Sequence, residues 1–270
     1  MSRDMSTDIA IEVKDGVQIV RFLRAAKKNA FTGAMYNAMS AALIEAEAND
    51  AIAVHLFLGS GGVFSAGNDI NDFLRRAEAS GPAGQGGIPA PSLDFIRCLP
   101  KVTKPMIAAV DGLAVGIGTT LLFHCDLVYA TPSASLRTPF LDLGLVQEAG
   151  SSILAPERLG YPRAFELICL GEPFSAERAL AAGLINAIVP AAELEARALG
   201  AAARLVAKPR QALLTARQLM RRRQGEISSM IDAEARCYAE LMAAPEAREA
   251  FTAFLEKRPA DFAKLRKPRA

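Results

Sequence analysis

Two glycine-rich segments carry the strongest chemical signal in this sequence. Residues 59–70 and 107–118 each include an apolar strand-like run and a turn rich in glycine, alanine or serine. Small residues let a backbone approach a ligand closely and turn its N–H groups outward. The second segment also opens an expected helix, whose first N–H groups lack partners and carry partial positive charge. Two such N–H groups on one oxygen would form an oxyanion hole, although two unrelated turns would give the same spacing.

Other catalytic motifs are incomplete. The glycines at 116 and 118 match the first two positions of a dinucleotide-binding motif, but Leu121 occupies the position of its third glycine. Ser65 lies in a glycine-rich turn, but Val63 breaks the pattern of a nucleophile elbow. The only histidines, His55 and His124, fall inside an expected strand and an expected apolar helix, so we expect both to be packed rather than catalytic.

No metal site is expected, because the sequence has two histidines, no clustered carboxylates and no close cysteine pairs. We expect its four cysteines to be buried, reduced thiols. The 270 residues are 51% hydrophobic with a net charge of +2, which favours a large core and excludes wholesale disorder. The N-terminus lacks an apolar signal segment, and the longest uncharged apolar stretch is too short to span a bilayer. We therefore expect a cytoplasmic protein with no membrane partner.

One stretch departs from this charge balance. Between Glu195 and Glu226 there is no acidic residue, and the basic residues end in three consecutive arginines at 221–223. The favoured interpretation is a solvated face opposite an apolar stripe formed by Leu205, Leu213 and Leu219. Phosphates of a small ligand come next, and nucleic acid is a weaker alternative.

The expected elements alternate between strands and helices, which indicates an α/β core. Residues 9–22 predict a β-hairpin, residues 32–49 a helix capped by Thr32, and residues 80–91 a mobile loop. Further strands are expected at 52–58, 105–110 and 127–130, with a buried helix at 116–123. After residue 190 only helices are expected, at 191–206, 209–222, 226–242 and 245–256.

Over nearly its whole length the chain resembles the crotonase (enoyl-CoA hydratase/isomerase) superfamily. The matching segments are 16–22, 28–32, 64–73, 104–116, 125–130, 174–185 and 253–258. The resemblance implies a spiral of ββα turns in residues 1–190 and a helical trimerisation region in residues 191–270. It also implies an acyl-CoA thioester substrate, no cofactor beyond the coenzyme A that the substrate carries, and a homotrimer or a dimer of trimers.

The same resemblance implies the site residues. The two oxyanion-hole donors would be the backbone N–H groups of Ala66 and Ile117. The residues expected to bind the substrate are Lys27, Lys28, Ser65, Ala66, Gly67, Asn68, Asp69, Ile70, Gly116 and Phe140. Lys27, Lys28 and the basic helical stretch could meet the phosphates of coenzyme A.

The acidic residues indicate which reaction this scaffold carries. Hydratases of the superfamily use two glutamates, and the matching positions here are Thr120 and Phe140. Water addition needs a base and an acid on one water, which neither side chain supplies. The sequence therefore argues against efficient hydration.

Glu148 supplies a different carboxylate. Residues 143–152 resemble the peroxisomal-type 3,2-trans-enoyl-CoA isomerases, which implies that Glu148 is the catalytic base of a double-bond shift in fatty-acid β-oxidation. An apolar pocket would raise its pKa and exclude water, and Phe140 suits such a pocket. Open alternatives are a solvated loop carboxylate at Glu148, a hydratase, lyase or thioesterase on the same scaffold, and an RNA-binding homologue.

Overall fold

The fold was obtained as a computed structural model, which describes residues 8–69 and 87–265. Ile70 and most of the loop expected at 80–91 lie outside the described residues. The end of that loop is instead the start of helix α3 (Ala90–Cys98). In the described part of the chain, no helix is long and apolar enough to cross a membrane.

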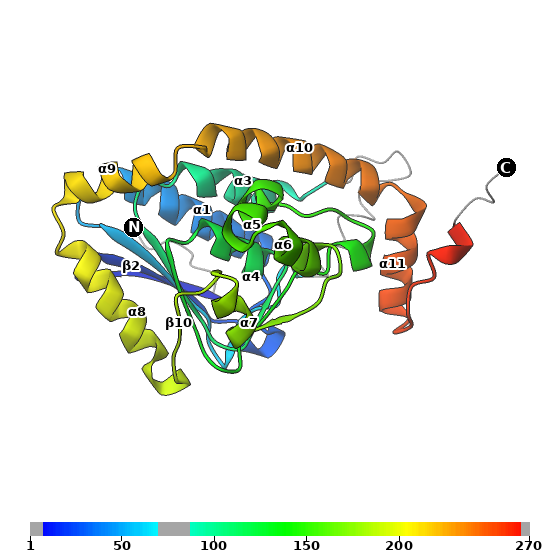
Figure 1. The fold of residues 1–270 in the computed structure, drawn as a ribbon, viewed down its shortest axis with the longest axis horizontal. Helices are drawn as coiled ribbons and strands as arrows, with labels where there is room; N and C mark the ends of the chain where they lie inside the picture. Colours follow the sequence, from blue (N-terminus) through cyan, green and yellow to red (C-terminus); the bar gives the residue numbers. More distant parts are fainter. Residues whose placement is uncertain (1–7, 70–86, 266–270) are drawn as a thin grey trace.

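A six-stranded sheet forms the centre of the molecule (Figure 1). Its strands, in spatial order, are β1 (Ile9–Lys14), β2 (Val17–Phe22), β3 (Val54–Leu58), β5 (Met106–Val110), β7 (Leu127–Ala130) and β10 (Ala187–Ile188). The predicted hairpin of β1 and β2 is confirmed, and Asp15 and Gly16 turn it with φ values of 50° and 80°. The other pairings are parallel, and β3 and β5 are buried along their whole length because both sheet faces are covered.

A second sheet lies beside the first and repeats its order along the chain. It contains β4 (Val63–Ser65), β6 (Leu113–Val115), β8 (Ser135–Arg137) and β9 (Phe174–Ser175). β4 follows β3, β6 follows β5 and β8 follows β7, so each turn of the chain adds one strand to each sheet. Successive turns stack closely, since a Cβ on Gly112 would lie 2.2 Å from the Gly62 carbonyl oxygen. The expected spiral of ββα turns is confirmed.

Helices cover both faces of the six-stranded sheet. On one face lie α1 (Gly33–Glu47), α3, α4 (Ile117–Thr120) with the 3-10 helix that follows it (Leu121–His124), α5 (Ser151–Leu159) and α6 (Tyr161–Ile168). The α7 helix (Ala176–Ala181) leads into β10. Thr32 caps α1 as expected, because its side chain accepts from the Met35 N–H.

The C-terminal helices begin on the opposite face. They are α8 (Ala191–Val206), α9 (Arg210–Met220), α10 (Gln224–Met242) and α11 (Pro245–Leu255). α8 buries Leu194, Ala198 and Ala202 in one core with the sheet, whereas α10 crosses the top of the molecule and α11 lies at the far end from α8 (Figure 1). The division at residue 190 therefore stays a prediction, while α8 belongs to the packing of the sheet.

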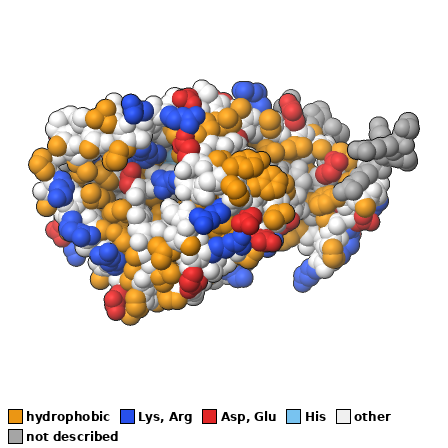
Figure 2. Space-filling model, in the orientation of Figure 1, with side chains coloured by type: hydrophobic (Ala, Val, Ile, Leu, Met, Phe, Trp, Pro, Cys, Tyr) orange, Lys and Arg blue, Asp and Glu red, His pale blue; other side chains and the backbone are white. Residues whose placement is uncertain are grey.

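The view in Figure 2 shows positive and negative side chains interspersed, with hydrophobic side chains gathered over α6. Tyr161 and Phe165 form that cluster, with exposed fractions of 67% and 46% and ring centroids 5.9 Å apart. A partly aromatic exposed surface of this kind is typical of a contact with another molecule.

The acid-free basic stretch is a solvated face only in part: most of its basic residues are exposed, but Arg217 and Arg221 are not. Arg217 is 4% exposed; its Nε donates to both carboxylate oxygens of Asp126 and its Nη1 to the Val102 carbonyl. Arg221 donates to the His124 carbonyl, and Leu219, expected in an apolar stripe, is 62% exposed. The interpretation as a solvated face opposite an apolar stripe therefore holds only in part: it is wrong for Arg217, Arg221 and Leu219. Arginines of this stretch fasten α9 and the following turn to the core.

We expect Arg217→Ala to lower the free energy of unfolding by about 3 kcal/mol, because it leaves Asp126 and a buried carbonyl without their donor. The measurement is urea denaturation followed by far-UV circular dichroism. Arg222→Ala, on the exposed neighbouring arginine, is the matched control and should leave the midpoint unchanged. Equal midpoints for the two variants would contradict the anchoring role.

Candidate active site

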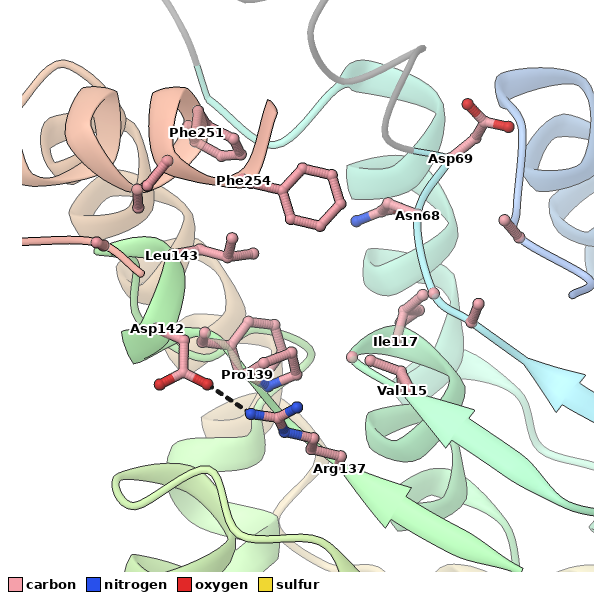
Figure 3. Close-up of a pocket in the computed structure, with 18 of the residues that line it drawn as sticks. Asn68, Asp69, Val115, Ile117, Arg137, Pro139, Asp142, Leu143, Phe251 and Phe254 are labelled. Atoms are coloured by element: carbon pink, nitrogen blue, oxygen red, sulfur yellow. Dashed lines mark hydrogen bonds and ion pairs between the residues drawn. The ribbon is translucent and has the colours of Figure 1, made fainter. Parts of the chain in front are cut away.

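A pocket of about 580 Å³ opens where the second sheet meets the C-terminal helices (Figure 3). Several parts of the chain line it: the segment before α1 with Lys27 and Ala30, the turn after β4, the start of α4, the segment after β8, helices α10 and α11, and the residues just after α11. The lining residues include Asn68, Ile117, Phe140, Leu143, Tyr238, Phe251 and Phe254. The structure therefore brings both glycine-rich turns into one pocket.

The two turns meet because β4 and β6 are adjacent parallel strands, with Ser65 paired to Ala114. Glycine is required at the closest points. A Cβ on Gly67 would lie 2.8 Å from the Val115 carbonyl oxygen, and one on Gly118 would lie 2.9 Å from the Ser65 carbonyl oxygen. Such distances are too short for a side-chain carbon, so larger residues at either position would push the turns apart.

The turn after β4 presents a different N–H group from the expected one. The Ala66 N–H donates to the Lys28 carbonyl at 2.8 Å, so it is not free to bind a ligand. Phe31 donates to Gly67 and accepts from Asp69, at 2.7 and 3.0 Å, in a parallel bridge opposite Asn68. In such a bridge the middle residue turns its own N–H to the other side.

Asn68 and Ile117, one from each glycine-rich turn, line the pocket with open N–H groups. Toward the described residues, neither backbone N–H donates a hydrogen bond. Gly67, with φ of 86°, turns the backbone between Ala66 and Asn68, which makes their N–H groups face different surroundings. Ala66 was expected to be a donor to the ligand, but its N–H is already bonded within the protein. The sequence alone does not reveal that Gly67 adopts a left-handed conformation, which decides which N–H is open.

Glu148 lies in the turn before α5 and is 4% exposed, which excludes a solvated loop carboxylate. Its Oε1 accepts from the Thr120 hydroxyl at 2.6 Å, and Thr120 ends the helix that Ile117 begins. Glu148 does not line the pocket, but its charge acts on Tyr238, which does. Thr120 therefore connects the carboxyl group to the helix whose first residue, Ile117, lines the pocket.

Burial raises the pKa of the Glu148 carboxyl to about 8. The hydrogen bond from Thr120 opposes this rise, and the negative charge of Glu234 adds to it. A carboxyl group with such a pKa gains and loses protons near neutral pH, which suits both proton abstraction and proton return.

The remaining expected binding residues divide into two groups. Those that line the pocket are Lys27, Ala66, Gly67, Asn68, Asp69, Gly116, Ile117 and Phe140. Lys28 and Ser65 do not line it. The Ser65 hydroxyl donates to the Asn29 carbonyl and accepts from the Gly67 N–H, so it holds the turn in shape.

Sequence reasoning missed the wall that α11 contributes. Ala250, Phe251 and Phe254 line the pocket from this helix, and Arg258 follows just beyond it. The spacing of apolar residues at 247, 250, 251 and 254 was a readable signal of one apolar helical face. Figure 3 shows Phe251 and Phe254 on one side of the pocket and the ion pair of Arg137 with Asp142, at 2.8 Å, on another.

Among the described residues, no group of three or more histidine, cysteine, aspartate or glutamate side chains could hold a metal. Both histidines are fully buried as expected: His55 pairs with Gln18 and His124 with the Ala149 carbonyl. All four cysteines are free, but the expectation of burial is wrong for Cys237, which is exposed.

Comparison with known proteins identifies the family. Residues 12–265 match the model of the enoyl-CoA hydratase/isomerase family. This chain belongs to that family. The solved structure of OdaA from Pseudomonas aeruginosa is 40% identical and superposes with a TM-score of 0.85, covering 93% of this chain and 99% of that one.

Relatives in this family are named for several reactions. Enoyl-CoA delta isomerase 2 of Rattus norvegicus is 34% identical over 190 residues, 70% of this chain but only 48% of that protein. This chain thus spans about half the length of that isomerase. The 1,2-epoxyphenylacetyl-CoA isomerase of Escherichia coli K12 is 33% identical over 94% of this chain and 97% of its own. Others are named 4-chlorobenzoyl coenzyme A dehalogenase or probable enoyl-CoA hydratase, so the family covers acyl-CoA chemistry broadly.

The raised pKa of Glu148 makes stability depend on pH. Because the folded protein favours the protonated carboxyl, wild type should lose roughly 4 kcal/mol of unfolding free energy relative to Glu148→Gln between pH 5 and pH 9. The loss accumulates as pH rises from the unfolded pKa toward the folded one. Urea denaturation at both pH values measures this loss. Glu240→Gln, at an exposed position of α10, is the control. A difference that stays constant with pH would contradict a buried, protonated Glu148.

Proposed function

We propose that this protein is an isomerase that converts 3-enoyl-CoA to 2-trans-enoyl-CoA. One observation carries the proposal: the buried carboxyl group of Glu148, whose pKa is raised to about 8, is hydrogen-bonded to Thr120, and the helix of Thr120 begins at a pocket with open backbone N–H groups at Asn68 and Ile117. A double-bond shift needs one group that accepts a proton at C2 and returns it at C4. Glu148 is suited to both steps because it exchanges its proton near neutral pH.

The open N–H groups of Asn68 and Ile117 would hold the thioester oxygen as negative charge develops on it. Glu148 accepts the proton from C2, and the electron pair of the broken C2–H bond spreads over the dienolate. The same proton then moves from Glu148 to C4, so no proton is gained or lost overall. In this proposal Asn68 replaces Ala66 as a donor, because the Ala66 N–H is already bonded to Lys28.

The site lacks what hydration would need. At the two positions where hydratases of the superfamily carry glutamates stand Thr120 and Phe140, and Phe140 lines the pocket. Thr120 uses its hydroxyl to donate to Glu148. Neither residue supplies a second carboxylate for orienting a water molecule, which favours isomerisation over hydration.

The pocket lining suits the two chemical parts of an acyl-CoA. Leu143, Phe251 and Phe254 give an apolar wall for the acyl chain. Lys27 lines the same pocket and provides a cation for coenzyme A phosphates, with Lys28 next to it in sequence. Arg258 also lines the pocket but pairs with Glu249 and Glu256, so we assign it no role in binding phosphates. Residues of the basic stretch on α9 do not line it, so we assign them no role in binding phosphates.

The same residues weaken the RNA-binding alternative. Arg217 and Arg221 bond to the protein's own core, and Arg223 pairs with Glu157 and Glu226. Arginines engaged in this way contribute little to a phosphate-binding surface. We keep, as part of the proposal, a cytoplasmic enzyme of acyl-CoA degradation that forms a homotrimer or a dimer of trimers and uses no cofactor besides the substrate's coenzyme A.

Glu148→Gln should lower kcat for 3-enoyl-CoA isomerisation by 10²-fold or more, since the amide cannot accept the C2 proton (about 10²–10⁴-fold for a general base). The assay follows formation of the conjugated 2-enoyl thioester, with 2-enoyl-CoA hydration measured in parallel. Full isomerase activity in the variant, or rapid hydration that the substitution leaves unchanged, would overturn the proposal.

Thr120→Val keeps the shape of the side chain and removes the hydroxyl that donates to Glu148. Loss of that hydrogen bond should raise the pKa of Glu148 further, so the acidic limb of kcat/KM should move to higher pH. The pH profile from 6 to 10 is the measurement. The control is Thr252→Val, at an exposed position of α11. Thr119→Val would not serve, because the Thr119 hydroxyl donates to the Ala114 carbonyl.

A further inference from the structure

Glu234 interrupts an otherwise apolar face of α10. The buried residues of this helix are Ile227, Ile231, Glu234 and Tyr238, at the spacing of one helical stripe. A carboxylate in such a stripe costs free energy unless donors compensate it. The hydrogen-bond donors around the Glu234 carboxylate therefore indicate its role.

The donors are the backbone N–H groups of Gly150 and Ser152, at 2.7 and 2.9 Å from the two Glu234 oxygens. Both belong to the turn that carries Glu148 into α5. We propose that Glu234 is the positioning residue of the catalytic base: it fixes this turn, and its charge sets the pH range in which Glu148 works. The inference rests on the proposed function, since it takes Glu148 as the base.

The turn needs external support because its backbone is unusual. Ala149 has φ of 61° and Gly150 has φ of 71°, and a left-handed conformation is unfavourable for alanine. On the other side of the turn, His124 Nε2 lies 2.7 Å from the Ala149 carbonyl oxygen. Burial lowers the pKa of His124 to about 3, so the ring is neutral and Nε2–H is the donor. Glu234 and His124 thus hold the turn from opposite sides.

The charge of Glu234 acts on Glu148 as well. In the described residues, the charge that acts on the Glu148 carboxyl is that of Glu234 of α10, and the charge of Glu148 in turn acts on Tyr36 of α1 and Tyr238 of α10. Glu234 accepts two backbone N–H bonds, whereas Glu148 accepts one hydroxyl, so Glu234 is the carboxyl of the pair that ionises first. Removing its charge should therefore make Glu148 easier to ionise.

Three variants separate these roles. Glu234→Ala removes both acceptors and should lower kcat by about 10²-fold with KM unchanged, because the turn shifts while the pocket wall stays in place. Glu234→Gln keeps one acceptor, so kcat should fall less, and the acidic limb of kcat/KM should move to lower pH. Glu240→Gln makes the same chemical change at an exposed position of α10 and should alter neither.

The pKa of Glu148 can also be measured without turnover, by carbon NMR of labelled carboxyl groups in wild type and Glu234→Gln, with Glu148→Gln to assign the signal. A lower Glu148 pKa in Glu234→Gln is the expected result, and this readout stands even if Glu234→Ala does not fold. An unchanged pKa together with an unchanged pH limb would overturn the inference. Isomerase activity that survives Glu148→Gln would instead overturn the proposed function.

Discussion

The close approach of two glycine-bearing turns is the constraint on which the rest of the structure depends. Gly67 and Gly118 each face a carbonyl oxygen of the other turn at a distance that no side-chain carbon could occupy. This contact sets β4 beside β6 and places Asn68 and Ile117 on one pocket. The paired strands fix the turns that follow them, so the open N–H groups need no rearrangement to receive a negative charge.

Local sequence pattern predicted most of the fold because it reflects burial along one element at a time. The helix expected at 191–206 coincides with α8, and the Asp15–Gly16 turn and the Thr32 cap lie where side-chain chemistry required them. The donor at the first turn could not be predicted, because the φ of Gly67 decides which N–H is open. Arg217 was missed for a related reason: a charged residue enters the core only when a distant partner, here Asp126, is present.

The raised pKa of Glu148 depends on the apolar surroundings of its carboxyl group. Without burial, the Glu148 carboxyl would remain ionised and could not return a proton at neutral pH. Phe140 and the α11 phenylalanines contribute apolar surface to the pocket. The two aspartates that line it, Asp69 and Asp142, are engaged in ion pairs with Arg24 and Arg137. In the proposed reaction, Glu148 is therefore the carboxyl group that exchanges the proton.

Helix α10 spans 19 residues, about 28 Å. Its N-terminal end follows the arginines that fasten α9 to the core, its middle carries Glu234, and Tyr238 near its other end lines the pocket. This one helix therefore connects the core, the turn that carries Glu148 and the pocket. A chimaera that received its C-terminal helices from another family member would keep Glu148 but replace both Glu234 and the α10 and α11 residues of the pocket, so the two properties would change together at this boundary.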